Sequence, residues 1–226
     1  MQCKEIHFSP YKTNIYPIKY KKLHKHIFFV HNFKEMKHKI AIFASGSGSN
    51  AENISKYLAH NEKIEVSLII SNKTDAYVLT RAKNLGIPSV VISAKEMTDA
   101  NRVLSLLQQQ SIDFIVLAGY LLKIPDYLIQ AYPQAIVNIH PALLPKFGGK
   151  GMYGDRVHKA VVEAGEKESG ITIHYVNEHY DSGTIIFQAT CPVLASDTYE
   201  DVAQKVHALE YAHFPHVIEE TINKMD

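Results

Sequence analysis

The sequence predicts an α/β protein: a mostly parallel, doubly wound (Rossmann-like) sheet with an antiparallel region at one edge. Three observations predict this fold class. Short apolar runs, typical of buried strands, alternate with runs of helix length from residue 37 onward. A glycine turn, SGSGSN at 45–50, follows the first apolar run directly. Near the C-terminus, the apolar runs 170–176 and 184–193 flank a short polar turn, which favours an antiparallel pair.

Composition places the chain among ordinary globular proteins and narrows its partners. Its 226 residues form one large domain or two small ones, with 46% apolar and 21% charged residues. A formal net charge of +1 implies neither a nucleic-acid footprint nor a membrane-surface preference, so we expect no nucleic acid and no membrane as partners. Cys3 and Cys191 are the only cysteines, which argues against a disulfide framework and a thiolate metal site.

Residues 1–35 differ from the rest of the chain. They hold seven lysines against Glu5 and Glu35, and no periodic apolar face. Their apolar cluster at 27–30 is too short for the core of a signal peptide, so we expect a cytoplasmic protein. We predict a basic, disordered N-terminal extension over 1–35, either inert or an arm for an acidic partner. Met36 could be the authentic start, and residues 36–226 are predicted to form a single domain.

The expected elements follow from periodicity and from helix and turn signals. Gly86 stands where a helix-ending residue with left-handed backbone is wanted. Expected strands cover 39–44, 64–70, 89–92, 114–118, 136–139, 170–176 and 184–193, and expected helices cover 51–60, 76–85, 96–110, 158–164 and 202–222.

The glycine turn at 45–50 joins a strand to a helix start, an arrangement that points backbone N–H groups at an anion. Gly46 and Gly48 permit a tight turn and close approach of a phosphate. Ala51 stands where a dinucleotide fingerprint has its third glycine, and no Gly-Lys-Ser/Thr follows. A monophosphate or another small anion therefore fits better than a pyrophosphate.

The segment AIVNIHPALLP at 135–145 reads as a buried strand that ends in two polar residues, Asn138 and His140. Pro141 ends the ladder, since proline has no N–H to donate. Ligand clefts open at the carboxyl ends of parallel strands, so both side chains should face a pocket. A core amide and a capped histidine are the alternative. The glycine-rich loop at 146–155 is either a lid or a plain connection, and the turn NEHYDSG at 177–183 carries Asp181.

Several segments together resemble the folate-dependent formyltransferases, and among them those that formylate phosphoribosylglycinamide. These segments are SGSGSN, LAGY with its following loop, NIHPALLPK, GITIHYVNEHYDSG and the final helix, and they span 37–222. The resemblance implies the formyltransferase fold. It also implies transfer of a formyl group from the co-substrate 10-formyltetrahydrofolate to the amine of phosphoribosylglycinamide, in purine (IMP) biosynthesis and one-carbon metabolism.

The resemblance also implies roles for individual residues. The catalytic residues would be Asn138, His140 and Asp181, with His140 the proton donor. A donor must polarise the formyl oxygen, and a group of near-neutral pKa must move a proton between the two nitrogens. The substrate-binding residues would be Gly48, Ser49, Asn50, His207 and Glu210. The folate-binding residues would be Leu121, Leu122, Lys123, Ile124, Asn138, Asn177, Glu178, His179, Tyr180 and Asp181.

The chain departs from the family pattern in places. The stretch after NIHPALLPK is longer than in the commonest form, and Arg156-Val157-His158 stands where His-x-His is frequent. Leu122 replaces a familiar arginine, with Lys123 beside it, and Arg102 is only a candidate for the arginine that contacts the folate tail. His158, His174 and His179 lack a metal-binding helix motif, so we expect them to be structural or pocket residues and expect no metal.

Three other functions compete with this one. A methionyl-tRNA formyltransferase would need a further C-terminal domain after the shared core. A formyltetrahydrofolate hydrolase would need a regulatory domain before the first strand. A non-catalytic nucleotide-binding module would have no need of Asn138, His140 and Asp181 together. We therefore expect an enzyme, as a monomer or a homodimer.

Overall fold

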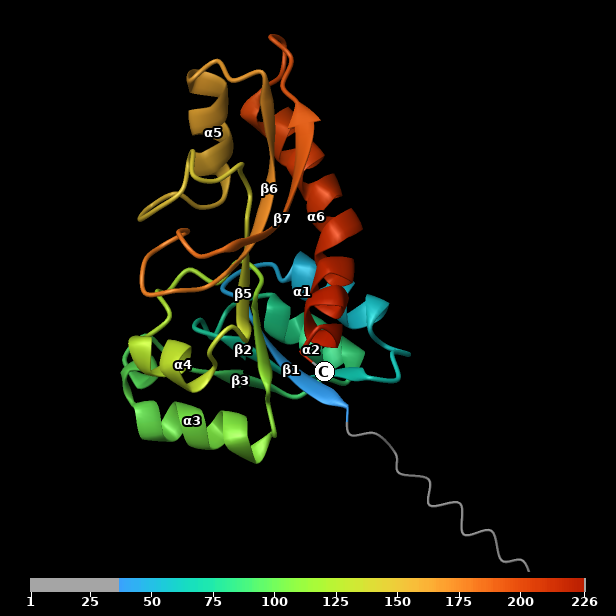
Figure 1. Ribbon diagram of the computed structural model, residues 1–226, viewed down its shortest axis with the longest axis vertical. Coiled ribbons are helices and arrows are strands. Elements are labelled where there is room, and N and C mark those ends of the chain that lie inside the picture. The colour runs from blue at the N-terminus through green and yellow to red at the C-terminus, as the bar shows by residue number, and fades with distance from the viewer. Residues whose placement is uncertain (1–36, 226) are drawn as a thin grey trace, which may run out of the picture. The chain divides into compact units, whose positions relative to one another are not determined.

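The computed structural model describes residues 37–225 (Figure 1). The predictions for residues 1–35 and for Met36 as the start lie outside the described residues. The strands are β1 His38–Phe43, β2 Ile64–Ser71, β3 Ser89–Val91, β4 Phe114–Leu117, β5 Ile136–His140, β6 Glu168–Tyr175 and β7 Ile185–Pro192. The helices are α1 Ser49–Tyr57, α2 Val78–Leu85, the 3₁₀ helix η1 Glu96–Thr98, α3 Ala100–Gln109, α4 Asp126–Ala131, α5 Asp155–Glu163 and α6 Tyr199–Asn223.

All seven strands form one sheet in the order β3-β2-β1-β4-β5-β6-β7. Neighbours from β3 to β5 are parallel, whereas β6 runs antiparallel to β5 and β7 antiparallel to β6. The order 3-2-1-4-5 is that of a doubly wound sheet. In such a sheet, ligands bind in a crevice at the carboxyl ends of the strands, where the strand order reverses, which here is between β1 and β4. The predicted fold class, including the antiparallel edge, is confirmed.

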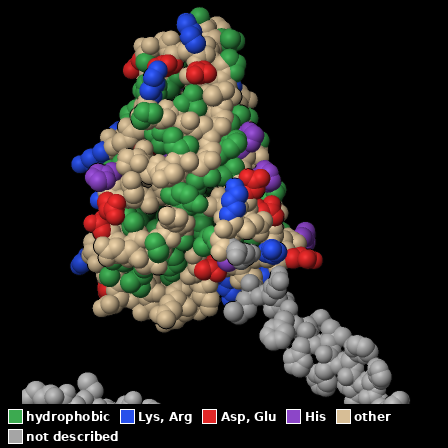
Figure 2. All heavy atoms as spheres, in the orientation of Figure 1, with side chains coloured by type: hydrophobic (Ala, Val, Ile, Leu, Met, Phe, Trp, Pro, Cys, Tyr) green, Lys and Arg blue, Asp and Glu red, His purple; other side chains and the backbone are tan. Residues whose placement is uncertain are grey.

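Alternation along the central strands places apolar side chains on both faces of the sheet. Ile40 and Ile42 pack with α1 and α6, while Ala41 and Phe43 pack with α3 and α4. In Figure 1, α3 and α4 accordingly lie on one face, and α1, α2 and α6 on the other. On the surface shown in Figure 2, acidic and basic side chains are interspersed, in keeping with a net charge near zero.

The prediction of one continuous helix over 96–110 is wrong, because this segment forms two helices, η1 and α3. Asp99 adopts an extended conformation (φ −88°, ψ 92°), and its carboxylate accepts a hydrogen bond from the Arg102 N–H at 3.1 Å. An aspartate in this role caps a new helix rather than continuing the old one. The short helix α4 was not predicted, since six residues after Pro125 are too few for a helical periodicity.

The long helix α6 is joined to α1 by a contact that depends on a proline. Pro215 has no N–H, so it leaves the carbonyl of Tyr211 without its helical donor. The Asn53 side-chain amide donates to that carbonyl at 3.0 Å. At its start, α6 is capped by Thr198, which exchanges hydrogen bonds with Asp201 in a capping box. Among residues 37–225, no helix is both long and apolar enough to cross a membrane.

Candidate active site

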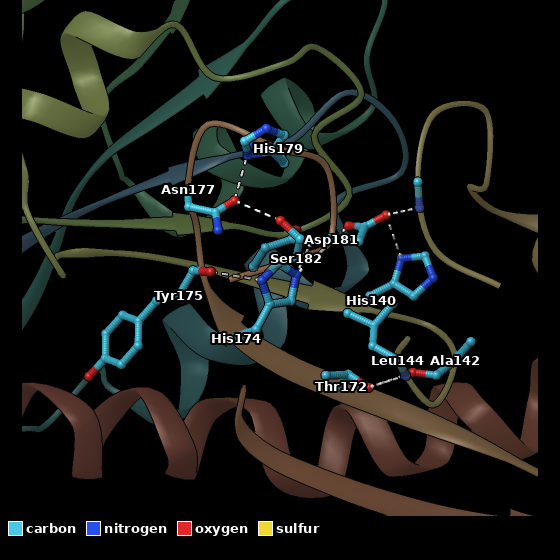
Figure 3. Close-up of polar contacts among 12 residues, drawn as sticks. His140, Ala142, Leu144, Thr172, His174, Tyr175, Asn177, His179, Asp181 and Ser182 are labelled. Carbon is cyan, nitrogen blue, oxygen red and sulfur yellow. Dashed lines mark hydrogen bonds and ion pairs between the residues drawn. The ribbon is translucent and has the colours of Figure 1, made fainter. Parts of the chain in front are cut away.

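The carboxyl end of β5 presents a row of polar side chains on one face of the sheet. Asn138 and His140 are two residues apart, so they point to the same side. In the antiparallel ladder Asn138 lies opposite His174 of β6, and His140 lies opposite Thr172. β5 ends at His140, directly before Pro141, as predicted. The register thus brings four polar groups together where a core sheet would hold apolar ones, and Figure 3 shows three of them, His140, Thr172 and His174.

His140 and Asp181 form the centre of this group. The His140 ring is almost fully buried, and its Nε2 donates to the Phe147 carbonyl at 2.8 Å. Its Nδ1 lies 3.6 Å from Asp181 Oδ2, longer than a hydrogen bond. The same carboxylate oxygen accepts the Gly149 N–H at 2.8 Å. The structure therefore joins His140 to a carboxylate that the sequence separates from it widely.

Burial and charge set the protonation of this pair. Burial holds the pKa of His140 below its usual value, although Asp181 and the Phe147 carbonyl act in the opposite direction. Burial alone would raise the pKa of Asp181. In the acid range where Asp181 titrates, the hydrogen bond with protonated His174, the charge of protonated His140 and the Gly149 N–H outweigh this effect, so the pKa of Asp181 is lowered. The site at neutral pH is therefore a neutral imidazole beside a carboxylate.

Asn138 is oriented by His174. The His174 Nδ1 lies 2.8 Å from the Tyr175 carbonyl, which can only accept, so Nδ1 carries the proton. In the neutral ring Nε2 is then an acceptor, and the Asn138 Nδ2 donates to it at 3.1 Å. Since an amide nitrogen has two hydrogens, the second N–H of Asn138 remains for a ligand oxygen. His174 was predicted to be a structural or pocket residue, and it serves here to orient the amide.

A large cavity of about 630 Å³ opens beside these residues. The glycine turn lies along one part of its wall, and the loop at 149–156 along another. Every residue predicted to be catalytic or to bind the phosphoribosyl substrate lines it: Gly48, Ser49, Asn50, Asn138, His140, Asp181, His207 and Glu210. The structure thus brings all of these predicted residues to one cavity, while their roles stay predictions.

The glycine turn has the geometry of an anion site. Gly48 has φ 72°, and a Cβ there would lie 2.3 Å from Val78 Cγ2, so only glycine fits. The Val78 N–H donates to the Gly46 carbonyl at 3.1 Å, which ties the turn to α2. The first N–H groups of α1, from Ser49 onward, have no partner within the helix and border the cavity.

Glu210 on α6 is buried, and it lines the large cavity together with the glycine turn. One of its oxygens accepts hydrogen bonds from Asn50 Nδ2 at 2.9 Å and from His207 Nδ1 at 2.8 Å. The hydrogen bond to Glu210 raises the pKa of His207, despite partial burial. The Asn50 amide is thereby committed to Glu210, and its Oδ1 is buried without a partner among the described residues. The Asn50 side chain positions Glu210, which leaves its backbone N–H for an anion.

A smaller cavity of about 80 Å³ adjoins the large one. Of the predicted folate-binding residues, it is lined by Leu122, Lys123, Ile124, Asn138, Asn177, His179, Tyr180 and Asp181. Leu121 lines the large cavity instead, and Glu178 lines neither of the two. The Asn177 Oδ1 accepts hydrogen bonds from the His179 N–H and the Ser182 hydroxyl, both at 3.0 Å, so it shapes the turn that carries Asp181 (Figure 3).

The structure also places Arg102 and His158, two of the residues at which the chain departs from the family pattern, and it bears on the question of a metal. Arg102 on α3 forms an ion pair with Glu96 of η1 at 2.8 Å and lines neither cavity, which does not favour it as a contact for the folate tail. His158 lines the large cavity from α5, and its Nδ1 is buried without a partner in the described part of the chain. Within residues 37–225 there is no cluster of side chains able to hold a metal ion.

Sequence reasoning missed the main-chain partners of the site, the Phe147 carbonyl and the Gly149 N–H. It also missed Thr172, which is fully buried. The Thr172 hydroxyl donates to the Ala142 carbonyl at 2.7 Å and accepts the Leu144 N–H at 3.0 Å. These contacts hold the segment after His140 (Figure 3). An alternating strand sequence gives no signal for them, because a threonine is ordinary in a strand.

Comparison with known proteins identifies a family and several relatives of this chain. Residues 38–218 match the family described as formyl transferase. A chloroplastic phosphoribosylglycinamide formyltransferase of Arabidopsis thaliana is 43% identical over 186 residues, covering 80% of this chain and 64% of that protein. The enzyme of that name from Haemophilus influenzae is 39% identical over 188 residues, covering 80% of this chain and 85% of the relative. The chain spans only about three fifths of the length of the first plant relatives, 64% and 60%.

Solved structures agree with the fold. The phosphoribosylglycinamide formyltransferase of Bacillus halodurans is 36% identical, with a TM-score of 0.76, and covers 83% of this chain and 97% of its own. That of Streptococcus pneumoniae is 37% identical, with a TM-score of 0.73 and coverages of 82% and 99%. The family match extends over most of the chain and over the whole sheet that carries Asn138 and His140, and the chain therefore belongs to the formyl transferase family.

Proposed function

We propose that this protein transfers a formyl group from 10-formyltetrahydrofolate to the amine of phosphoribosylglycinamide. The observation that carries the proposal is the position of His140 and Asp181 beside Asn138. Asn138 and Asp181 line both the large cavity, which carries the anion turn, and the small cavity. A reaction between two ligands needs its reactive groups where the two sites meet. Relatives bearing the name phosphoribosylglycinamide formyltransferase support this choice of substrates.

In this proposal the phosphoribosyl substrate binds in the large cavity and the folate ring binds in the small cavity. The substrate phosphate lies against the backbone N–H groups of Gly48, Ser49 and Asn50, where the dipole of α1 favours negative charge. Its ribose or glycinamide part reaches Glu210. The folate ring occupies the small cavity between the 122–124 loop and the 177–181 turn, whose apolar and polar linings suit a flat heterocycle.

The chemistry follows from the geometry of three side chains. The amine nitrogen attacks the formyl carbon, and the free N–H of Asn138 stabilises the charge that forms on the formyl oxygen. Because His140 is neutral, its Nδ1 takes a proton from the attacking nitrogen. It then gives that proton to N10 of the folate as the C–N10 bond breaks. The Asp181 carboxylate, 3.6 Å away, stabilises the transient imidazolium.

A formyl-transfer assay tests the proposal. Purified protein is mixed with 10-formyltetrahydrofolate, with and without phosphoribosylglycinamide, and folate absorbance is followed. We expect turnover that depends on the acceptor and is lost in His140→Ala, because the proton path is removed. His216→Ala is a matched control, since His216 is exposed on α6 and pairs with Glu220 at 3.4 Å. Folate consumption without an acceptor would indicate a hydrolase instead, and no consumption by folded protein would indicate a binding module.

The remaining expectations belong to the same proposal. We infer that residues 36–226 act as the catalytic domain, that the enzyme works in the cytoplasm as a monomer or homodimer, and that it needs neither a metal nor a nucleic acid. Fractionation of cells that express the full chain, together with light scattering of the purified protein, would test the compartment and the oligomeric state.

A further inference from the structure

The segment Phe147–Gly149 touches both members of the central pair through its main chain. The Phe147 carbonyl takes the Nε2–H of His140 at 2.8 Å, and the Gly149 N–H donates to Asp181 Oδ2 at 2.8 Å. That oxygen is also the one nearest to His140 Nδ1. Three residues of one loop thus bridge the imidazole and the carboxylate, and we call them the 147–149 bridge.

A carbonyl oxygen can only accept a hydrogen bond, so the bridge decides how His140 carries its proton. In the neutral ring, hydrogen bonding to Phe147 places the proton on Nε2 and leaves Nδ1 with a free lone pair. Nδ1 is the nitrogen on the side of Asp181. The Asp181 contact at 3.6 Å is too long to be a hydrogen bond, so Nδ1 remains able to accept a proton.

We propose that the 147–149 bridge is a positioning element that selects the Nε2–H tautomer of His140 and thereby makes Nδ1 the nitrogen that exchanges protons with the substrate. This inference rests on the proposed function. It assigns a role to a loop that the sequence presented only as a lid or a plain connection.

The bridge is anchored at its first residue. Phe147 has φ 55°, an uncommon conformation for a bulky side chain, and it packs against the core cluster beneath α6. Just before it, the Lys146 ammonium pairs with Glu166 at 2.9 Å. On the other side, the Thr172 hydroxyl holds the Ala142 carbonyl and the Leu144 N–H. These contacts fix where the Phe147 carbonyl points.

Gly148 makes the close approach to Asp181 possible. A Cβ at this position would lie 2.5 Å from Leu144 Cδ2 and 3.2 Å from Asp181 Cβ. Any larger residue must therefore push the bridge away from one or both neighbours. Asp181 itself has φ 51°, so the turn that carries it is also held in an uncommon conformation. Neither the bridge nor the turn that carries Asp181 can therefore move easily to relieve a clash at Gly148.

The bridge acts on a ring that other charges also face. Asp181 from the turn after β6, His174 from β6 and Glu210 from α6 all influence the titration of His140, and His158 on α5 is coupled to it. None of these groups specifies which ring nitrogen is protonated in the neutral form as directly as the Phe147 carbonyl does. The tautomer is therefore the property that reports on the bridge.

The test measures the tautomer of His140 by ¹⁵N NMR of histidine-labelled full-length protein, with the signal assigned from the spectrum of His140→Ala. We expect a neutral ring protonated at Nε2 in the wild type. In Gly148→Ala we expect a mixture of tautomers. We also expect kcat to fall by about 10- to 100-fold, as for small misplacements of a catalytic group, with KM values within about threefold.

Gly165→Ala is the matched control. Gly165 follows α5 with φ 64°, and no atom lies within 4 Å of the place where a Cβ would stand, so alanine strains the backbone there without touching the site. It should lower stability and leave both the tautomer and kcat unchanged. If Gly148→Ala fails to fold, the double variant with Leu144→Ala removes the closest clash and keeps the 3.2 Å contact with Asp181.

The outcomes separate this inference from the proposed function. An active wild type whose neutral His140 carries its proton on Nδ1 would overturn the bridge alone, and so would a folded Gly148→Ala with unchanged tautomer and kcat. A wild type with the Nε2–H tautomer but no formyl transfer would refute the proposed function, and the positioning role would fall with it.

Discussion

Replacing Asp181 by asparagine separates the charge of this side chain from its position. Asparagine has nearly the same shape, and its Oδ1 can still accept the Gly149 N–H that Asp181 Oδ2 accepts at 2.8 Å. The loop contact should therefore survive. What is lost is the negative charge 3.6 Å from His140 Nδ1.

The size of the effect follows from that distance. At an effective dielectric constant of about 20, two unit charges 3.6 Å apart attract by about 5 kcal/mol, before desolvation is subtracted. Each ~1.4 kcal/mol corresponds to a factor of ten in rate. Since part of the attraction offsets the burial of both groups, we expect Asp181→Asn to lower kcat by about 10²- to 10³-fold, which lies within the range of a lost acid–base function.

Steady-state kinetics and NMR titration measure the two consequences. The KM for phosphoribosylglycinamide should change by less than about threefold, because the glycine turn that is proposed to hold the phosphate is untouched. The pKa of His140 should fall further below its usual value, since Asp181 is a group that raises it against the effect of burial. Asp75→Asn, at an exposed position before α2, is the control and should behave as the wild type.

A folded Asp181→Asn enzyme with kcat within about threefold of the wild type would refute the charge argument. So would a rise in the pKa of His140, since a lost negative charge cannot favour an imidazolium.

The other predictions concern stability and pH. Tyr120→Phe should raise the free energy of unfolding by about 1 kcal/mol, because the Tyr120 hydroxyl is buried without a partner in the described residues; urea denaturation would show the opposite sign if the hydroxyl were satisfied. Burial lowers the pKa of both His140 and His158, so the unfolded chain binds more protons than the folded one below about pH 6.5. The stability that these two groups contribute is present above that pH and is lost as the pH falls, and His158→Leu should reduce the drop in Tm between pH 7.5 and 5.5. His207 has a raised pKa and works in the opposite direction, so His207→Gln should enlarge the drop, and a smaller drop would contradict its pairing with Glu210.

Much of the fold could be predicted from the sequence, because it depends on patterns local to each segment. Alternating apolar residues such as Ile40 and Ile42 on one side and Phe43 on the other predict a strand buried on both faces, and the structure has it so. Gly86 was predicted to end a helix, and it does, with φ 70°. The break at Asp99 was missed, because capping by a carboxylate competes with helix continuation and the outcome depends on local conformation.

For the site, the sequence determined the chemical inventory: an amide and an imidazole at a strand end, a carboxylate in a turn, and glycines before a helix. Only the tertiary structure decided how they meet. Asp181 reaches His140 because β6 pairs antiparallel with β5 and its turn returns to the end of that strand. The Phe147 carbonyl and the Gly149 N–H could not be foreseen, since every residue carries the same main-chain groups. Which of them faces an imidazole or a carboxylate is decided by the path of the folded chain and not by residue type.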